Sequence, residues 1–348
     1  MLQLNWKTDS TTNPQEEQNT MRAMVIKEYG DYDVFQEAEI PDPQAGPGEV
    51  RIRVRASSVN PLELKIRAGL VPAGPELPAI LNADVGGIID QVGEGVTHLK
   101  EGDAVIGCAG GLKGRQGALA DLMVADARLV TLAPKQLPLE DAAVLPLVFM
   151  TAWNALVERA DIQPDQWALI QGGTGGVGHV AIQLAKARGA KVAASVSTQE
   201  KAELARSLGA DEVILYSNEE PEAYVQRITA GEGFPIVFDT VGGASLDNSF
   251  KAVSLAGQVV TINGRNTHDL SLMHSKSLTL HVVFRALPML TGKGMEAEPA
   301  RLAALTQLID EGKIKPLLAS ESFKFTEIAK AHAYLDAGKA VGKIQLLR

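Results

Sequence analysis

The sequence contains a single cysteine, Cys108, and only six histidines among its 348 residues. One cysteine excludes an internal disulfide framework and a zinc site built from four cysteines. It is also compatible with the reducing cytoplasm, and we expect that location. The histidines are scattered and include no H-x-x-x-H pair, so they give no sign of a helical metal site.

The chain also lacks an excess of basic residues. It has 33 lysines and arginines against 42 aspartates and glutamates, which gives a net charge of −9. Without a basic stripe, no surface is available to neutralise the phosphates of a nucleic acid. An acidic surface also repels anionic membranes. We therefore expect neither a nucleic acid nor a membrane as a partner.

Long apolar runs are absent as well. No window approaches the roughly 18 consecutive apolar residues of a membrane-spanning helix. The polar residues 1–20, "MLQLNWKTDSTTNPQEEQNT", cannot be a secretory signal. We expect them to form a disordered extension, with Met21 as the first folded residue.

The length suggests two domains, and the first folded stretch is rich in strand signals. Residues 49–57, "EVRIRVRAS", alternate apolar Val50, Ile52 and Val54 with arginines, which predicts a half-buried strand. More short segments rich in glycine and β-branched residues follow. This pattern predicts a partly open β-barrel.

The pattern changes between about Trp167 and Leu280, where strands and helices alternate. The six candidate strands are "WALIQGG", "KVAASV", "EVILY", "IVFDT", "QVVTING" and "LTLHVV". Such alternation predicts a doubly wound parallel sheet of the α/β class, the Rossmann arrangement. Two helical patterns and a final strand, "GKIQLL", follow in the last ~60 residues.

A glycine-rich stretch follows the first of these strands and opens a helix. It fits the pattern G-x-G-x-x-G, and this context is typical of dinucleotide binding. We expect the first glycine to make the tight turn, the second to let the backbone approach the pyrophosphate, and the third to let the helix pack closely. The predicted pyrophosphate-binding residues are Gly173, Thr174, Gly175, Gly176, Val177 and Gly178.

The end of the second strand indicates which dinucleotide binds. NAD-binding proteins have a carboxylate there for the adenosine ribose, whereas this chain has Ser197 and Thr198, followed by Lys201. Hydroxyls and an ammonium suit a 2′-phosphate, which predicts NADPH as the cofactor. Alternatively, Ser197 and Glu200 form a capping box that serves helix stability alone, and Lys201 is a solvated lysine. Glu200 also weakens the charge argument.

Several segments, in order, resemble one family: "MRAMVIKEYG", "SSVNPLELKIRAG", "PLVFMTAWNALVERADIQPDQWALIQGGTGGVG", "VFDTVGG" and "GKAVGKIQLL". The chain resembles the zinc-lacking medium-chain dehydrogenases/reductases of the quinone oxidoreductase (zeta-crystallin-like) type. The resemblance implies a GroES-like partly open β-barrel, residues 21–145, completed by residues 285–348. The Rossmann NADPH-binding domain, residues 146–284, is inserted between the two parts of the barrel.

Zinc-dependent relatives in this family hold a catalytic metal with a cysteine, a histidine–glutamate pair and a second cysteine. The matching positions here are Asn60, Ala83 with Asp84, and Leu147. Because this set cannot form a zinc site, we predict no metal. Without a Lewis acid, hydride transfer to an already polarised acceptor is the favoured chemistry. We therefore expect an NADPH-dependent reductase of quinones or α,β-unsaturated carbonyls.

The resemblance suggests two catalytic candidates, Asn60 and Lys65. Asn60 would lie beside the nicotinamide ribose, or it is simply a turn asparagine before Pro61. Lys65 would donate to an enolate oxygen or to the ribose, or it is a surface lysine. Family members specialised for quinones often have a tyrosine at the position of Lys65. The lysine here therefore favours enones over quinones as the substrate. Glu63 replaces the more usual aspartate, so its role is open.

Further cofactor contacts follow from the resemblance and from strand ends. Thr151 matches a threonine near the nicotinamide carboxamide. Tyr216 matches a tyrosine that stacks or hydrogen-bonds near the adenosine phosphate, or it is an aromatic residue at the edge of a strand. Val241 and Asn263 end two strands, where ligands of open α/β sheets bind. Family members usually form homodimers through edge strands, and residues 278–287 are the candidate edge, or else an internal strand. An acyl-thioester (enoyl) reductase and a non-catalytic NADPH-binding structural or sensor protein remain alternative functions.

Overall fold

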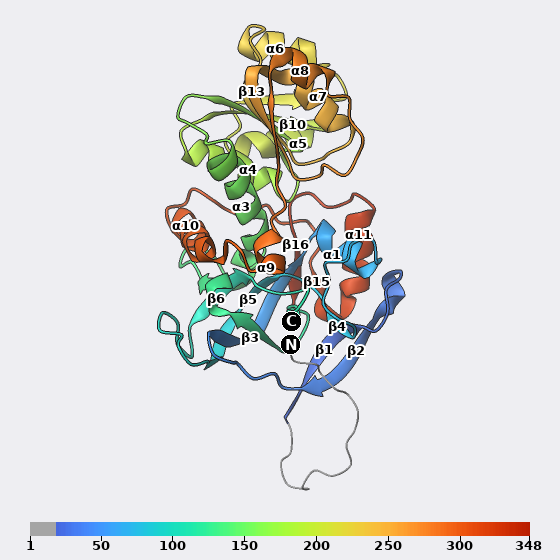
Figure 1. Ribbon diagram of the computed structural model, residues 1–348, viewed down its shortest axis with the longest axis vertical. Coiled ribbons are helices and arrows are strands. Elements are labelled where there is room, and N and C mark those ends of the chain that lie inside the picture. Colours follow the sequence, from blue (N-terminus) through green and yellow to red (C-terminus); the bar gives the residue numbers. More distant parts are fainter. Residues whose placement is uncertain (1–18) are drawn as a thin grey trace.

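The computed structural model describes residues 19–348, so most of the expected N-terminal extension lies outside the described residues. Thr20, which the sequence analysis places in the extension, is the first residue of strand β1. Figure 1 shows two lobes, with a parallel sheet and its helices above and a β-barrel below. Within residues 19–348, no helix has the length and apolar character needed to cross a membrane.

The lower lobe is a partly open barrel, as predicted. A seven-stranded sheet has the order β15-β16-β3-β5-β6-β8 with β7 also on β3, and a three-stranded sheet has the order β2-β1-β4. The strands are β1 (Thr20–Ile26), β2 (Phe35–Pro41), β3 (Glu49–Val59), β4 (Ala79–Ile80), β5 (Asp84–Val92), β6 (Ala104–Cys108), β7 (Leu122–Asp126), β8 (Val130–Leu132), β15 (Phe323–Lys324) and β16 (Ile344–Leu347).

The long strand β3 organises this barrel. Val50, Ile52 and Val54 are buried while the intervening arginines point outward, so the predicted alternation is confirmed. One side of β3 pairs with β5, and the other pairs with β7 over its first half and β16 over its second half. A segment from the end of the sequence therefore completes a sheet that begins near residue 50.

The upper lobe is built on a six-stranded parallel sheet with the order β11-β10-β9-β12-β13-β14, so all six predicted strands are confirmed. The chain winds outward in one direction from β9 and then returns to wind in the other, which leaves a crevice at the carboxyl ends of the central strands. These strands are β9 (Trp167–Gln171), β10 (Lys191–Val196), β11 (Glu212–Leu215), β12 (Phe234–Asp239), β13 (Val253–Thr261) and β14 (Thr279–Val282).

Helices lie in both lobes (Figure 1). The helices are α1 (Pro61–Arg67), α2 (Leu139–Ala142), α3 (Pro146–Trp153), α4 (Gly178–Ala187), α5 (Gln199–Ser207), α6 (Pro221–Thr229), α7 (Ala244–Ala252), α8 (Ser271–Lys276), α9 (Leu287–Thr291), α10 (Glu298–Asp310) and α11 (Ile328–Asp336). Short 3-10 turns are η1 (Tyr32–Val34), η2 (Ala127–Leu129), η4 (Met295–Ala297) and η5 (Phe325–Glu327), and α3 continues as the π-helix η3 (Asn154–Arg159).

Helix α3 lies at the junction of the two lobes (Figure 1). Its buried residues Phe149 and Met150 belong to an apolar cluster that also contains Ile26 of the barrel and Val180 of the upper lobe. Because the lobes share this core, the surfaces that face each other across the crevice are held in a fixed relation.

Candidate active site

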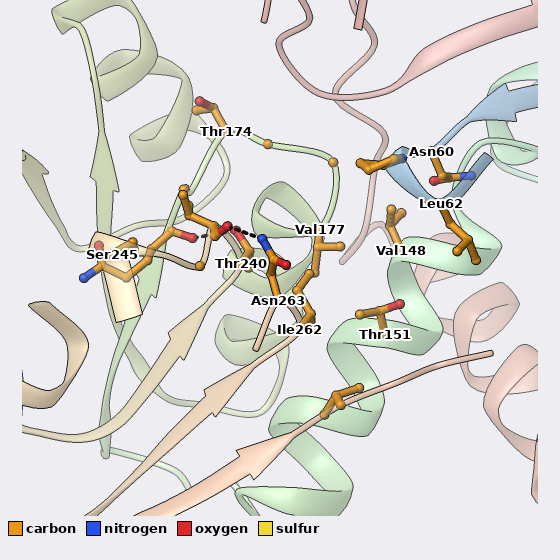
Figure 2. Close-up of a pocket in the computed structure, with 18 of the residues that line it drawn as sticks. Asn60, Leu62, Val148, Thr151, Thr174, Val177, Thr240, Ser245, Ile262 and Asn263 are labelled. Carbon is orange, nitrogen blue, oxygen red and sulfur yellow. Dashed lines mark hydrogen bonds between the residues drawn. The ribbon is translucent and has the colours of Figure 1, made fainter. Parts of the chain in front are cut away.

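A cavity of about 890 Å³ lies between the lobes, at the carboxyl ends of β9, β10, β12 and β13. The glycine-rich loop lines it on one side. Asn60 and Leu62 of the α1 segment and Val148 and Thr151 of α3 face it from the other side (Figure 2). Its size and position fit an extended ligand together with a small second molecule.

The first turn of the glycine loop differs from the prediction. The residue with left-handed backbone is Gly172, at φ +72°, and not Gly173. Gly173 instead packs against the sheet, because an added Cβ would lie 2.8 Å from the Cβ of Ala194. At Gly178 an added Cβ would lie 2.1 Å from the Gly172 oxygen, so α4 begins in direct contact with the turn. Only glycine allows these approaches.

The middle of the loop faces the cavity. Thr174, Gly175, Gly176 and Val177 all line it, whereas Gly173 and Gly178 do not. An added Cβ would meet its first neighbour at 3.2 Å on Gly175 and at 3.5 Å on Gly176. The open backbone and the start of α4 form a cradle of the kind that holds phosphates.

A buried histidine supports this cradle. The Gly175 oxygen lies 3.1 Å from the His179 backbone nitrogen, which donates to it, and 3.0 Å from the ring Nδ1. Burial lowers the pKa of His179 to about 4, which keeps the ring neutral at physiological pH. A neutral ring with its proton on Nδ1 donates to the carbonyl and fixes the loop.

Ser197 and Thr198, both predicted to bind the 2′-phosphate, have different positions at the corner between β10 and α5. The Lys201 ammonium donates to the Ser197 hydroxyl at 3.1 Å, and both residues line the cavity. Thr198 is exposed, does not line the cavity, and is the N-cap of α5, with its hydroxyl accepting from the Lys201 backbone at 3.3 Å. The alternative capping box of Ser197 and Glu200 is therefore wrong, because the cap lies one residue later.

The neighbouring end of the cavity carries charges of both signs. Arg265 lines it, as do Glu219 and Glu220. The Glu219 carboxylate is held by two hydrogen bonds of 2.9 Å from Arg227, which lower its pKa. Tyr216, 59% exposed, also lines the cavity.

Thr151, Val241 and Asn263 all line the cavity, and Figure 2 labels Thr151 and Asn263. They come from α3 and from the ends of β12 and β13. The Thr151 hydroxyl donates to the Leu147 oxygen at 2.7 Å, so its lone pairs remain available to accept. The Asn263 amide donates to the Val241 oxygen at 2.9 Å, which ties the two strand ends together.

A buried polar cluster lies at the barrel side of the cavity, around Asn60. Its Nδ2 donates to Asp84 at 3.1 Å and to Glu63 at 3.3 Å, and its Oδ1 accepts from the Lys343 ammonium. The Asp84 carboxylate also accepts from the Leu147 backbone at 2.8 Å. The structure thus brings together the positions that the sequence matched to the metal ligands of zinc-dependent relatives.

Lys343 is the member of this cluster that sequence reasoning missed. Its side chain is 2% exposed, and its ammonium lies 3.6 Å from Asp84 Oδ2 and 3.4 Å from the Val59 oxygen. The available signal was a lysine placed directly before the otherwise apolar strand "IQLL". The direction of the side chain, however, depends on the tight turn at Gly342, which is not readable from the pattern.

The charges of the cluster perturb one another. Burial raises the pKa of Glu63 to about 7, and the negative charge of Asp84 adds to this effect while Lys343 opposes it. Burial lowers the pKa of Lys343, and Asp84 and Glu63 oppose that shift. One cation and two carboxyl groups therefore share a site from which water is excluded.

Comparisons with known proteins agree with this architecture. Residues 46–135 match the family model "Alcohol dehydrogenase GroES-like domain", and residues 176–291 match the model "Zinc-binding dehydrogenase". An NADPH-dependent alkenal/one oxidoreductase of Arabidopsis thaliana is 33% identical over 93% of this chain and 78% of its own length.

Two solved structures have the same fold. An alcohol dehydrogenase superfamily protein from Novosphingobium aromaticivorans is 43% identical, with a TM-score of 0.90 over 94% of this chain and all of the other. The Escherichia coli quinone oxidoreductase complexed with NADPH is 27% identical, with a TM-score of 0.82 over the same shares. The chain belongs to the medium-chain dehydrogenases/reductases of the zinc-lacking quinone oxidoreductase type. It is therefore an oxidoreductase of a nicotinamide-dependent family.

In this oxidoreductase, the end of the cavity away from the Ser197–Lys201 pair is mostly apolar. Its lining includes Leu62, Val71, Cys108, Leu112, Leu147 and Met289. Burial raises the pKa of the Cys108 thiol, so this cysteine is not an activated nucleophile. Lys65 of α1 also lines the cavity and is half-buried, and among residues 19–348 its ammonium makes no hydrogen bond or ion pair.

The donor set of this oxidoreductase does not fit a zinc ion. Within the described part of the chain, no group of three or more histidine, cysteine, aspartate or glutamate side chains could hold a metal. The Lys343 ammonium already bonds Asn60 and lies beside Asp84. A divalent ion bound by these two residues would be repelled by that charge at short range.

Proposed function

We propose that the enzyme uses NADPH to reduce α,β-unsaturated carbonyls or quinones by hydride transfer, without zinc. The observation that carries this proposal is one continuous cavity. It joins the open glycine loop, the Ser197–Lys201 pair and an apolar end in which the Lys65 ammonium has no partner among the described residues. These three features correspond to a dinucleotide, its 2′-phosphate and a reducible acceptor.

The cofactor assignment rests on the charges around Ser197. The β10–α5 corner presents a hydroxyl and an ammonium to the cavity, and Glu219 nearby is neutralised by Arg227. A 2′-phosphate gains charge-assisted hydrogen bonds in such a place, whereas NADH leaves the ammonium without an anionic partner. The NADPH complex of the Escherichia coli relative and the NADPH-dependent Arabidopsis relative support this assignment.

Each part of the cavity then has a task in binding. The backbone of residues 174–177 holds the pyrophosphate, and Gly173 and Gly178 allow the close packing behind it. Tyr216 flanks the adenosine end. The Thr151 hydroxyl accepts from the nicotinamide carboxamide, while the ends of β12 and β13 at Val241 and Asn263 support the ring. When bound there, NADPH supplies a hydride.

The acceptor end acts on the other reactant. Its apolar wall excludes water and orients the unsaturated bond. Reduction of an enone at the β-carbon places negative charge on the carbonyl oxygen, and the free Lys65 ammonium can donate to that oxygen. The side-chain donors of Asn60 are engaged by Asp84 and Glu63, so we assign Asn60 to the wall near the nicotinamide ribose rather than to proton donation.

The test is a steady-state assay of cofactor oxidation with matched panels of enones and quinones, using NADPH and NADH in parallel. We expect turnover with NADPH that resists metal chelation, and a loss with Lys65→Met that is larger for enones. A preference for NADH would contradict the cofactor, and loss on chelation would contradict the metal-free chemistry. Activity confined to long acyl thioesters, or binding of NADPH without turnover, would support the alternative functions.

The same proposal includes a homodimer. Strand β14 is the last strand of the upper sheet, and Val282 and Phe284 at its end are 57% and 46% exposed. A free edge with exposed apolar side chains is a natural place for a second copy to pair.

A further inference from the structure

The turn before β16 connects the glycine loop to the barrel wall. The Gly342 backbone nitrogen donates to the Thr174 oxygen at 2.9 Å. An added Cβ on Gly176 would lie 3.5 Å from Cδ of Lys343, so the lysine stem runs directly beside the loop. The turn itself is fixed, because Gly342 has φ +75° and an added Cβ would lie 2.0 Å from the Leu317 oxygen.

The other end of the same side chain determines the orientation of Asn60. An ammonium only donates, and an ionised carboxylate only accepts. Because the Lys343 ammonium can only donate, Asn60 turns its amide oxygen toward the lysine, and its amide nitrogen then faces Asp84 and Glu63. Asn60 is the N-cap of α1, the helix that carries Lys65.

Stability alone is a poor reason for this arrangement. Taking one cation and two carboxyl groups out of water costs free energy that the pairing only partly returns, and apolar residues of the same size often stabilise equally well. Lys343, Asp84 and Glu63 are each at most 2% exposed. A function that needs a fixed geometry explains their presence better.

The geometry points to Lys343 as a positioning residue of the hydride-transfer reaction: it holds Asn60 and the start of α1 in register with the glycine loop. Its stem contacts the cofactor side and its ammonium the acceptor side, so one side chain sets the spacing of the two reactants. This inference rests on the proposed function, because the proposed function assigns NADPH to one end of the cavity and the reducible acceptor to the other.

The central experiment compares Lys343→Met with Lys343→Arg and with Lys339→Met, an exposed lysine in the same segment. We expect Lys343→Met to lower kcat by about 100-fold while the Kd for NADPH changes less than about twofold, because misplacement of the reactants affects chemistry rather than cofactor binding. Lys343→Arg should recover part of the loss, and Lys339→Met should match the wild type. An unchanged kcat in a folded Lys343→Met enzyme would overturn the inference.

A second variant covers the case in which Lys343→Met does not fold. Lys343→Met combined with Asp84→Asn removes the unpaired buried charge, so stability should return. If Lys343 positions the reactants, kcat stays low in this double variant. If the lysine is only a counter-ion for the fold, kcat recovers along with the melting temperature, and the inference fails.

A readout without turnover separates this inference from the proposed function. Hydrogen exchange of the α1 amides should be faster in Lys343→Met than in the wild type, both with and without NADPH, and unchanged in Lys339→Met. If the wild type reduces no enone or quinone, the proposed function fails, and the exchange data still test the link. Equal exchange in all three proteins would refute the link even if turnover is observed.

Discussion

At the scale of single residues, the cavity separates side chains that are free to meet a ligand from those that are already engaged. Lys65 has no partner within residues 19–348, and Lys201 bonds only a hydroxyl, so both ammonium groups can receive an oxygen anion. Asn60, by contrast, has its donors and its acceptor in use. The distinction predicts which substitutions change ligand recognition and which change geometry.

Lys201 offers the sharpest test of the cofactor. Lys201→Glu replaces an attractive charge with a repulsive one beside the expected 2′-phosphate. We expect the preference for NADPH over NADH to fall by on the order of a hundredfold, because a charge-assisted hydrogen bond is lost and repulsion is added. The ratio of kcat/KM values for the two cofactors measures it. Lys191→Glu makes the same charge change at the exposed start of β10 and should leave the ratio unaltered.

His332 gives a prediction about pH. The ring is fully buried, neither ring nitrogen has a hydrogen-bond partner within the described residues, and burial together with Arg67 lowers its pKa to about 3. The folded state therefore keeps the ring neutral while the unfolded state takes up a proton below pH 6.5. Stability is lost as the pH falls through this window, by at most about 1.4 kcal/mol per pH unit.

The variant His332→Phe removes this proton uptake and keeps an aromatic ring against Phe35. Denaturant unfolding of both proteins at several pH values between 4 and 8 gives the comparison. The difference in unfolding free energy should shift in favour of the variant below pH 6.5 and be constant above it. If the unfolding free energies of the two proteins differ by the same amount at every pH, then proton uptake by His332 does not cause the loss of stability at low pH.

At the scale of elements, the start of α5 shows how one residue of register changes the meaning of a motif. The sequence offers two hydroxyls in succession, Ser197 and Thr198, and both suit a phosphate or a helix cap. The structure gives the cap to Thr198 and the cavity to Ser197. The two roles lead to opposite consequences for the two alanine variants.

Thr198→Ala should lower the free energy of unfolding by about 1 kcal/mol, the usual cost of losing an N-cap, with little change in the preference for NADPH. Ser197→Ala should weaken NADPH binding several-fold with little change in stability, because it loses one hydrogen bond to the phosphate. Thermal melts and NADPH titrations on the same two proteins provide the data. If Ser197→Ala lowered stability and Thr198→Ala weakened NADPH binding, then Ser197 would be the helix cap and Thr198 the phosphate contact.

The elements themselves were largely predictable, because they follow from periodicity. The alternation in β3 and the six strands of the upper sheet depend on local pattern and were predicted correctly. Backbone conformation was less predictable, because any of several neighbouring glycines could have made the first turn of the loop. In the structure Gly172 makes it, and Gly173 packs against Ala194. For the site, the motif predicted only the part of the cavity wall that it forms itself, at Thr174, Gly175, Gly176 and Val177.

Lys343 shows the limit of local pattern. It lies 283 residues from Asn60, and nothing near either residue reveals the contact. The cluster forms because β16 pairs antiparallel with β3, which places Ile344 opposite Val59. Long-range pairing of this kind depends on the whole fold, and a sequence read one segment at a time does not contain it.

At the scale of the whole molecule, the reactive cavity lies between two lobes that share one apolar core. The proposed contact between two copies lies on the upper lobe. The last strand of its sheet, β14, pairs on one side only within residues 19–348. Strand β14 is not part of either barrel sheet, so oligomeric state and barrel integrity can be varied separately.

Val282→Lys should convert the proposed homodimer to a monomer, because a charged side chain on an edge strand opposes pairing with a second copy. Light scattering during size exclusion would show a mass of 37.0 kDa for the variant and twice that value for the wild type. Leu132→Lys places the same charge at another exposed apolar site, 49% exposed in the barrel, and should remain dimeric. A monomeric wild type would contradict the proposed assembly.

The pairing of β16 with β3 also imposes an order on assembly. The six strands of the upper sheet lie within residues 167–282, so they can come together soon after that stretch leaves the ribosome. The barrel must wait until Ile344–Leu347 has been synthesised before one side of β3 is filled. During that interval the second half of β3 is an open template for foreign strands, and a nascent chain that stalls there would be prone to aggregate.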